Sequence, residues 1–452
     1  MSLLDPLFRS PAVADILSDK SCIQAMLDFE AALARAESRA GVISSGASGA
    51  IESKCRAELF DLGAIGESGA VAGNLAIPMI KQLTALVAQR DKEAARYVHW
   101  GATSQDAIDT GRVLQLRQAL DLIARDLDGL VEPLGRIAQK HRATLMAGRT
   151  WMQQALPITL GVKIAGWLDA LVRHSTRLKE TRERCLVLQF GGAAGTLAAL
   201  GQRGTDVAAL LSAELKLALP DIPWHAHRDR MAEIATTLGL CMGTVGKIAR
   251  DISLHMQTEV AEMFEPAAEG RGGSSSMPHK RNPVTASVLL ATAARVPGLV
   301  STMLSAMVQE DERGLGGWQA EWETLPEIVG LTAGAVHHLS VLLPALEIDA
   351  DHMRKNLNIT EGLLFAEAVS MALADKIGKA QAHELVQAAC MRAIKEKRGL
   401  RPILSGDDRV SVHLNSADLD RLFNPHNYLG ASDEFLYRVV AASRVKIPAG
   451  EE

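Results

Sequence analysis

The sequence predicts an all-α protein in which three helical domains are arranged around a central bundle of about five long helices. Aromatic residues make up only 4% of the 452 residues, while alanine and leucine are abundant, and this composition favours helix over strand. Hydrophobic residues make up 48%, which is enough for a large core. Apolar residues also recur at alternating spacings of three and four positions, which is the pattern of a helix with one buried face.

The first predicted domain covers residues 1–110 and consists of short helices. Residues 29–37 are rich in strong helix formers, and Gly41 follows them as a stop signal. Arg9 precedes this helix in an F-R-S-P context. It is either a solvated surface residue or a ligand for an anionic group.

The second predicted domain, residues 111–350, holds the bundle. Pro133 is expected to bend its first helix locally. The third helix continues its apolar seam into His255 and Glu259, which we expect either to bond each other at a spacing of four or to mark where the seam approaches a site. The three seams are Leu116, Leu120, Ile123, Leu127, Leu130, Leu134 and Ile137; Leu160, Ile164, Trp167, Leu171 and Leu178; and Met231, Ile234, Leu238, Cys241, Val245, Ile248 and Ile252.

Two further bundle helices are predicted over 284–308 and 323–346. Because a single five-helix bundle would leave apolar stripes exposed, we expect a homo-oligomer. The third predicted domain, residues 351–452, is small and built from shorter helices, of which 361–376 and 379–397 are the clearest.

The net charge and the cysteines bear on the partners of the protein and on its compartment. The net charge of -5 comes without a long run of one sign and gives no support for nucleic acid or a membrane surface as a partner. The five cysteines form no C-x-x-C pair, so we expect free thiols in a reducing cytoplasm. We find no signal-peptide pattern and expect no membrane span.

His225 and His227 form an H-x-H pair without further ligands at suitable spacing, so no metal is expected.

Residues 270–283 read G-R-G-G-S-S-S-M-P-H-K-R-N-P and interrupt the helical pattern within a loop predicted over 267–283. Glycine and proline disfavour helix and strand interiors there. A loop of glycine and serine is commonly a linker. This one also offers a hydroxyl at Ser274, a cation at Lys280 and an amide at Asn282, a mixture that favours a binding or catalytic loop.

Residues 99–110 read H-W-G-A-T-S-Q-D-A-I-D-T. Thr103 or Ser104 can cap the helix that follows, with Asp106 in its first turn. A helix N-terminus also presents unpaired N–H groups and the positive end of a dipole, so the same residues suit a carboxylate ligand. The two roles are compatible.

Residues 273–283 resemble the G-S-S-x-M-P-x-K-x-N-P signature of the fumarase/aspartase superfamily. The resemblance implies that Ser274, the first serine after the glycine, acts at the carbon alpha to a carboxylate, with Ser275 as the alternative register. It also implies that the hydroxyls of Thr103 and Ser104 hold a substrate carboxylate. The resemblance covers nearly the whole chain and implies a tetramer whose subunits share active sites.

Residues 148–161 resemble the G-R-T-H-x-Q-x-A-x-P-x-T-x-G segment of the same family, which makes Arg149 and Thr150 candidate substrate ligands. Trp151 stands where lyases of the family usually have a histidine that serves the leaving group. An amine or hydroxide leaving group benefits from a proton donor, whereas a carboxylate reacts as the anion because its reference pKa is about 4. Trp151 therefore favours a reaction in which a carboxylate is the nucleophile.

The T-S-Q-D, G-R-T-W-M-Q and N-Y-L-G segments resemble those of the 3-carboxy-cis,cis-muconate cycloisomerases of this superfamily. The resemblance implies intramolecular addition of a carboxylate to give 4-carboxymuconolactone, in the protocatechuate branch of the beta-ketoadipate pathway, without a cofactor or metal. Lys280 and Asn282 would stabilise the developing charge, and Ser274 would deliver the proton. The candidates for the remaining carboxylates of this small tricarboxylate substrate are Arg9, Arg149 and Arg313.

Two alternatives stay open. An adenylosuccinate-lyase-like C–N lyase would release fumarate, but Trp151 disfavours it, and residues 318–322 lack the arginine that helps to hold a nucleotide phosphate in those enzymes. An inactive structural relative would need neither Ser274 nor Lys280. His141, at a helix end, is either structural or a further acid–base group.

Overall fold

The computed structural model describes residues 3–267, 272–273, 277 and 279–443. Ser274, the predicted proton carrier, and the neighbouring Ser275 and Ser276 lie outside these residues. The chain divides into two compact units. Unit 1 comprises Met1–Leu127, His174–Gly246 and Val288–His338, and unit 2 comprises Asp128–Arg173, Lys247–Ser287 and Leu339–Glu452.

Five helices in the described part of the chain are longer than 21 residues, which confirms the predicted all-α fold with about five long helices. They are α7 (Ser104–Lys140), α8 (Leu160–Cys185), α10 (Asp229–His255), α11 (Val284–Ser305) and α12 (Gly317–Leu342). The predicted seams are buried. In α7 each of the first six seam residues is at most 1% exposed, and only Ile137 is partly exposed.

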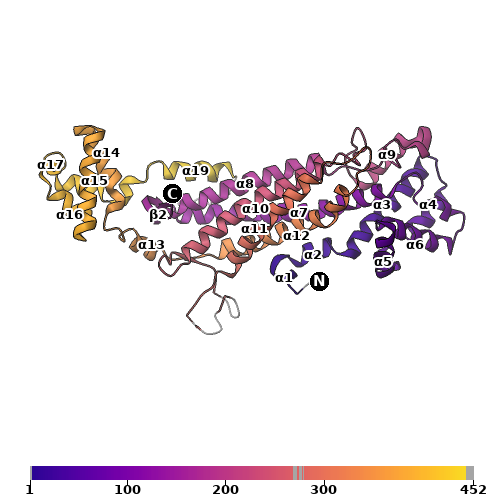
Figure 1. Ribbon diagram of the computed structural model, residues 1–452, viewed down its shortest axis with the longest axis horizontal. Helices are drawn as coiled ribbons and strands as arrows, with labels where there is room; N and C mark the ends of the chain where they lie inside the picture. Colours follow the sequence, from indigo (N-terminus) through magenta and orange to yellow (C-terminus); the bar gives the residue numbers. More distant parts are fainter. Residues whose placement is uncertain (1–2, 268–271, 274–276, 278, 444–452) are drawn as a thin grey trace. The chain divides into compact units, whose positions relative to one another are not determined.

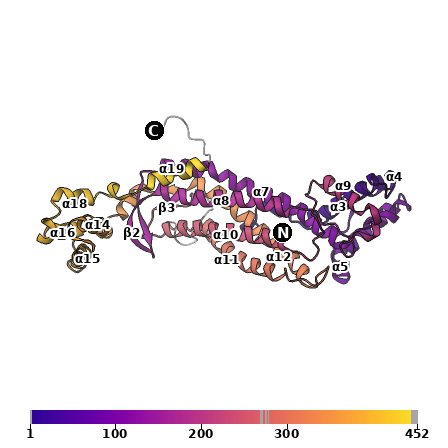
Figure 2. The same cartoon turned by 90° about the horizontal axis from the view of Figure 1, so that it is seen from above.

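The shorter helices of unit 1 come mostly before α7. They are α1 (Asp5–Phe8), α2 (Pro11–Ile16), α3 (Asp19–Arg39), α4 (Ser45–Glu52), α5 (Leu62–Ala72), α6 (Ala76–Ala88) and, later in the chain, α9 (Gly204–Leu215). Helix α3 packs against α4 and α9 (Figure 2). Its apolar side chains Ile23, Met26 and Leu27 join one buried core with Leu83 of α6.

Side-chain hydrogen bonds connect the long helices within unit 1. A 2.9 Å bond joins the buried hydroxyls of Thr181 on α8 and Thr237 on α10. Two turns further along these two helices, His174 Nε2 and the Thr244 hydroxyl are 2.7 Å apart. Such pairing satisfies polar groups that would otherwise be costly to bury.

Unit 2 contains two short antiparallel sheets that were not predicted. Strands β1 (Leu145–Thr150) and β2 (Gln153–Thr159) form a hairpin, and β3 (Met263–Phe264) pairs with β4 (Glu347–Ile348). The remaining helices of this unit are α13 (Ala350–Asn356), α14 (Ala366–Ile377), α15 (Lys379–Glu396), α16 (Leu400–Ser405), α17 (Asp408–Ser411), α18 (Ser416–Leu422) and α19 (Ser432–Ala442). Helix α15 packs against both α14 and α16 (Figure 1).

The predicted pairing of His255 with Glu259 is wrong. Helix α10 ends at His255, so Glu259 is no longer one helical turn away and is exposed. The imidazole Nδ1 of His255 instead lies 2.7 Å from the carboxylate of Glu262.

Two of the described helical segments, α11 and Gly317–Ala345, are long and apolar enough to cross a membrane by length and composition alone. Buried core helices pass the same test, so this is weak support for a membrane span.

Candidate active site

The start of α7 is organised by the fully buried carboxylate of Asp106. It accepts hydrogen bonds from the backbone N–H groups of Gly191, at 3.0 Å, and Gly192, at 2.9 Å. It also accepts from the N–H of Thr103 at 3.0 Å and lies 2.7 Å from His225 Nε2. Asp106 thus satisfies the N–H of Thr103, the residue before α7, and holds the turn at Gly191 and Gly192 against the start of this helix. His225 of the H-x-H pair is committed to this structural network.

The N–H of Asp106 donates to the Thr103 carbonyl at 2.9 Å, and the Thr103 hydroxyl accepts a bond from another segment of the chain. Nη1 of Arg313 donates to Thr103 Oγ1 at 2.8 Å. Both side chains are half-buried, as is Ser104. The structure therefore brings together two predicted site residues, 210 positions apart, at the N-terminus of a long helix where a carboxylate is favoured.

A second buried network in unit 1 was not predicted. The Arg228 guanidinium, 2% exposed, donates to both oxygens of Asp109 and both oxygens of Glu321 at 2.6 to 3.1 Å. The Trp318 indole N–H donates to Asp109 at 3.0 Å. Trp318 and Glu321 both belong to residues 318–322, the W-Q-A-E-W segment that departs from the adenylosuccinate lyase pattern. Their side chains take part in this internal network.

In unit 2, Arg149 of β1 is paired with the buried carboxylate of Glu262. Its Nη1 and Nη2 atoms donate to the two carboxylate oxygens at 2.9 and 2.6 Å. Asn356 Nδ2 donates to Glu262 at 2.8 Å, and His255 Nδ1 bonds it as well. Burial raises the pKa of Glu262, but these bonds outweigh burial and lower the pKa to about 2. Glu262 therefore neutralises the charge of Arg149.

The β1–β2 hairpin ends in two exposed apolar side chains. Trp151 is 97% exposed and Met152 is 69% exposed, and both have left-handed backbone conformations with φ of 51° and 66°. Such conformations are uncommon outside glycine and mark a tightly constrained turn. Thr150, just before the tip, is also exposed.

The loop over residues 267–283, called the signature loop below, has its two sides close together in its described part. The N–H of Asn282 donates to the carbonyl of Gly272 at 2.9 Å. Gly272 has φ of +66°, and a Cβ atom there would lie 2.9 Å from the Asn282 carbonyl oxygen. This position therefore requires glycine. The Lys280 side chain is exposed.

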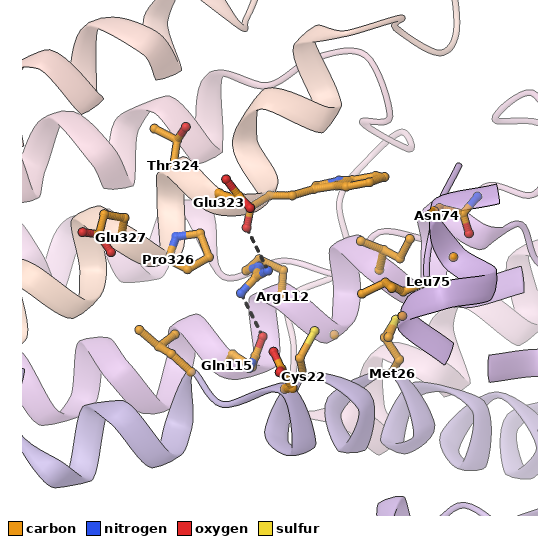
Figure 3. A pocket seen from close by; sticks show the side chains of 18 of the residues that line it. Cys22, Met26, Asn74, Leu75, Arg112, Gln115, Glu323, Thr324, Pro326 and Glu327 are labelled. Atoms are coloured by element: carbon orange, nitrogen blue, oxygen red, sulfur yellow. Dashed lines mark hydrogen bonds between the residues drawn. The ribbon is translucent and has the colours of Figure 1, made fainter. Parts of the chain in front are cut away.

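Arg9 lines a cavity of about 950 Å³ in unit 1, to which α3, α7 and α12 also contribute residues. Figure 3 shows Cys22, Arg112 and Glu327 of these helices around it. Its guanidinium forms an ion pair with Glu327 of α12. On another wall, Arg112 donates to the Gln115 side chain at 3.0 Å and to the Trp322 carbonyl at 3.4 Å. The cavity is therefore lined by cations that already have partners.

His141 follows the end of α7, where its Nδ1 lies 3.0 Å from the Thr144 hydroxyl. Burial lowers the pKa of this imidazole. Its position fits the structural alternative. Among the residues that the structure describes, no three His, Cys, Asp or Glu side chains are grouped to hold a metal.

Comparison with known proteins identifies the family. A family model described as "Lyase" matches residues 8–298, and one described as "Adenylosuccinate lyase C-terminus" matches residues 362–439. The chain belongs to the lyase family. The predicted resemblance to the fumarase/aspartase superfamily is therefore confirmed.

Within this lyase family, the chain is similar to named cycloisomerases. A 3-carboxy-cis,cis-muconate cycloisomerase of Pseudomonas aeruginosa is 56% identical over 97% of this chain and 96% of its own length. One of Pseudomonas putida is 54% identical over 92% of this chain and 99% of its own length. The crystal structure of the 3-carboxy-cis,cis-muconate lactonizing enzyme from Pseudomonas putida superposes with a TM-score of 0.92 and 52% identity, covering 98% of this chain and 99% of that one.

Proposed function

We propose that this chain is a 3-carboxy-cis,cis-muconate cycloisomerase, an enzyme that forms 4-carboxymuconolactone. The observation that carries the proposal is that relatives with this name share more than half of their residues with the chain over nearly its whole length. The substrate is a small tricarboxylate, and the reaction is an internal rearrangement with no second substrate.

The proposed reaction begins when a carboxylate oxygen of the substrate bonds to the ring-closing carbon. The electron pair of the double bond moves to the carbon alpha to another carboxylate. Lys280 and Asn282 stabilise the charge that accumulates there, because fixed donors stabilise charge that develops in the transition state. Ser274 then gives its proton to the alpha carbon and is later reprotonated. Atoms balance, because the lactone forms from the ionised substrate with uptake of one proton, which solvent returns to Ser274, and the acid forms of substrate and product are isomers.

Trp151 supports a carboxylate nucleophile. The attacking carboxylate is already ionised at neutral pH, so forming its bond to carbon requires no proton transfer to or from that oxygen. The indole, 97% exposed at the hairpin tip, has no acidic proton to offer at neutral pH. We propose that this tip extends to the active site of a partner subunit, where an aromatic wall excludes water from the lactone.

The three arginines predicted to bind substrate carboxylates differ in their partners within the chain. Arg149 and Arg9 each pair with a carboxylate of the chain, Glu262 and Glu327 respectively. Arg313 instead donates to a neutral hydroxyl. We therefore favour Arg313, together with Thr103 and Ser104, as the primary ligand for a substrate carboxylate, with Arg149, Thr150 and Arg9 as further candidates.

We also propose that the chain forms a homo-oligomer. The resemblance to the fumarase/aspartase superfamily implies that this oligomer is a tetramer. The support is helix α11, in which only 28% of an 18-residue apolar stretch is buried within one chain. Exposed apolar surface of this length is costly unless another chain covers it. The cytoplasmic location remains a proposal, supported by five free cysteines.

The test is to incubate the purified protein with 3-carboxy-cis,cis-muconate and to identify the product by NMR. The proposal expects 4-carboxymuconolactone as the product. A parallel incubation with adenylosuccinate is expected to release no fumarate. Fumarate release without lactone formation would instead assign the chain to the C–N lyases of the family.

A further inference from the structure

Two glutamates hold the two sides of the signature loop. Glu265 follows β3 and is 4% exposed. Its carboxylate accepts from the backbone N–H groups of Thr285, at 3.0 Å, and Ala286, at 2.8 Å, in the first turn of α11. A carboxylate at this position satisfies unpaired N–H groups and interacts favourably with the helix dipole. Glu265 therefore connects the segment that enters the loop to the helix that leaves it.

Glu347 lies on β4, opposite Phe264 of β3. One carboxylate oxygen accepts from the N–H of Ala267 at 2.8 Å, and the other is 2.9 Å from Nη2 of Arg281. The Ala267 N–H, followed by Arg281, lowers the pKa of Glu347 below its usual value. The carboxylate is therefore ionised at neutral pH and holds residues on both sides of the loop.

Arg281 makes two further contacts. Its Nη2 atom donates to the carbonyl of Glu265 at 2.5 Å, and its guanidinium lies over the Phe264 ring at 5.0 Å from the centroid. Three partners of different kinds therefore fix this planar group: a carboxylate, a carbonyl and an aromatic face. A guanidinium can satisfy all three at once, whereas an ammonium group cannot reproduce this planar geometry.

The residues on either side of Arg281 are Lys280 and Asn282, both assigned to the reaction in the proposed function. Anchoring Arg281 limits the backbone freedom of both neighbours. The 2.9 Å bond from the Asn282 N–H to the Gly272 carbonyl limits it further. Groups that stabilise a transition state must be placed accurately, and a displacement of about 1 Å can reduce the rate about 100-fold.

We propose that Arg281, held by Glu347 and Glu265, is a positioning residue that sets the backbone of Lys280 and Asn282 for the reaction. The inference rests on the proposed function for its kinetic consequence. Arg281 and Glu347 are 39% and 45% exposed, so their ion pair contributes little to global stability. Removing the pair should therefore slow the reaction without unfolding the protein.

The test compares Arg281→Met and Glu347→Gln with a matched control, Arg438→Met, which removes an exposed arginine paired with Glu434 on α19. We expect kcat for 3-carboxy-cis,cis-muconate to fall about 10- to 100-fold in both loop variants. We expect KM and Tm to stay close to those of the wild type. Arg281→Lys should restore part of kcat, because it keeps the ion pair but not the planar contacts.

Three results would overturn the inference. One is a kcat within twofold of the wild type in both loop variants. Another is a loss of activity that follows a fall in Tm, which would make the role structural. The third is a change confined to KM, which would mean that Arg281 binds substrate directly.

A measurement without substrate separates this inference from the proposed function. Hydrogen exchange of peptides that span residues 277–286 should be faster in Arg281→Met and Glu347→Gln than in the wild type and in Arg438→Met. Unchanged exchange would contradict the anchoring role even if the wild type were active. A wild type that leaves the diene unchanged, with faster exchange in the variants, would contradict only the assigned reaction.

Discussion

Glu37 of α3 is a fully buried carboxyl group, and neither of its oxygens has a hydrogen-bond partner among the described residues. Burial, with a smaller contribution from Glu30, raises its pKa to about 9. The unfolded chain has a glutamate pKa of about 4.3, so between these values folding takes up a proton. This group therefore reduces the free energy of unfolding progressively as pH rises from about 4.3 towards 9.

Replacing Glu37 with methionine should stabilise the protein more at pH 8 than at pH 5. The differential gain is at most about 4 kcal/mol over these three pH units. The measurement is Tm by differential scanning fluorimetry at both pH values, with the exposed Glu67→Met of α5 as a control. A gain of equal size at the two pH values would contradict the account.

Candidate site residues were easier to predict from the sequence than the partners with which they form ion pairs. The sequence analysis identified Arg149 and Arg9 as candidate ligands for anionic groups, but their carboxylate partners lie 113 and 318 positions away. Such pairing depends on tertiary structure, and no local spacing reports it. The roles predicted for the site residues stay predictions. Ser274 in particular lies outside the described residues.

At the scale of single elements, glycines set how closely helices approach. A Cβ atom on Gly161, at the start of α8, would lie 2.5 Å from the Ala138 carbonyl oxygen of α7 and 2.8 Å from Leu436 Cδ1 of α19. Gly166, on the same helix, has open space at its Cβ position, with no described atom within 4 Å beyond its chain neighbours and the nearby backbone of its own helix. A side chain larger than hydrogen would therefore clash with neighbouring atoms at Gly161 but has room at Gly166.

We expect Gly161→Ala to destabilise the protein by about 1 to 3 kcal/mol, because backbone atoms must move to relieve the overlap. Gly166→Ala should stabilise it by about 0.5 to 1 kcal/mol through the helix propensity of alanine. Urea denaturation followed by circular dichroism measures both. Similar effects of the two substitutions would contradict the packing described at Gly161.

Three of the long helices, α7, α8 and α10, were predictable because each has an apolar seam of several turns, and the residues of these seams are almost all buried. Other elements lacked such a signal. The β1–β2 hairpin is short, with a glycine, a proline and a bulge between Ala147 and Arg149, so no clear alternation marks it. The end of α10 at His255 was likewise unmarked by a stop residue, which is why the wrong acidic partner was predicted.

At the scale of the whole molecule, the apolar surface of α11 leads to a prediction about assembly. We expect sedimentation analysis to give a multiple of the 48.4 kDa chain mass. Leu304→Arg on α11, at a side chain 49% exposed in one chain, should lower that mass and reduce activity. Val71→Arg on α5, at a side chain 92% exposed, is the control. A 48.4 kDa species for the wild type would contradict the proposed oligomer.

The family and the all-α fold were predictable because the signature motifs and the helical seams are long enough to be specific. The division into domains 1–110, 111–350 and 351–452 stays a prediction. The five long helices contribute residues to both compact units.

The most direct test of the central claim is the loss of diene absorbance when the protein is mixed with 3-carboxy-cis,cis-muconate, measured beside a Ser274→Ala variant. We expect rapid loss with the wild type and at least about 100-fold slower loss with the variant, as is typical when a proton-transfer group is removed. No loss with the wild type would contradict the cycloisomerase assignment. Equal loss with both proteins would contradict the role of Ser274 and assign proton delivery to another residue.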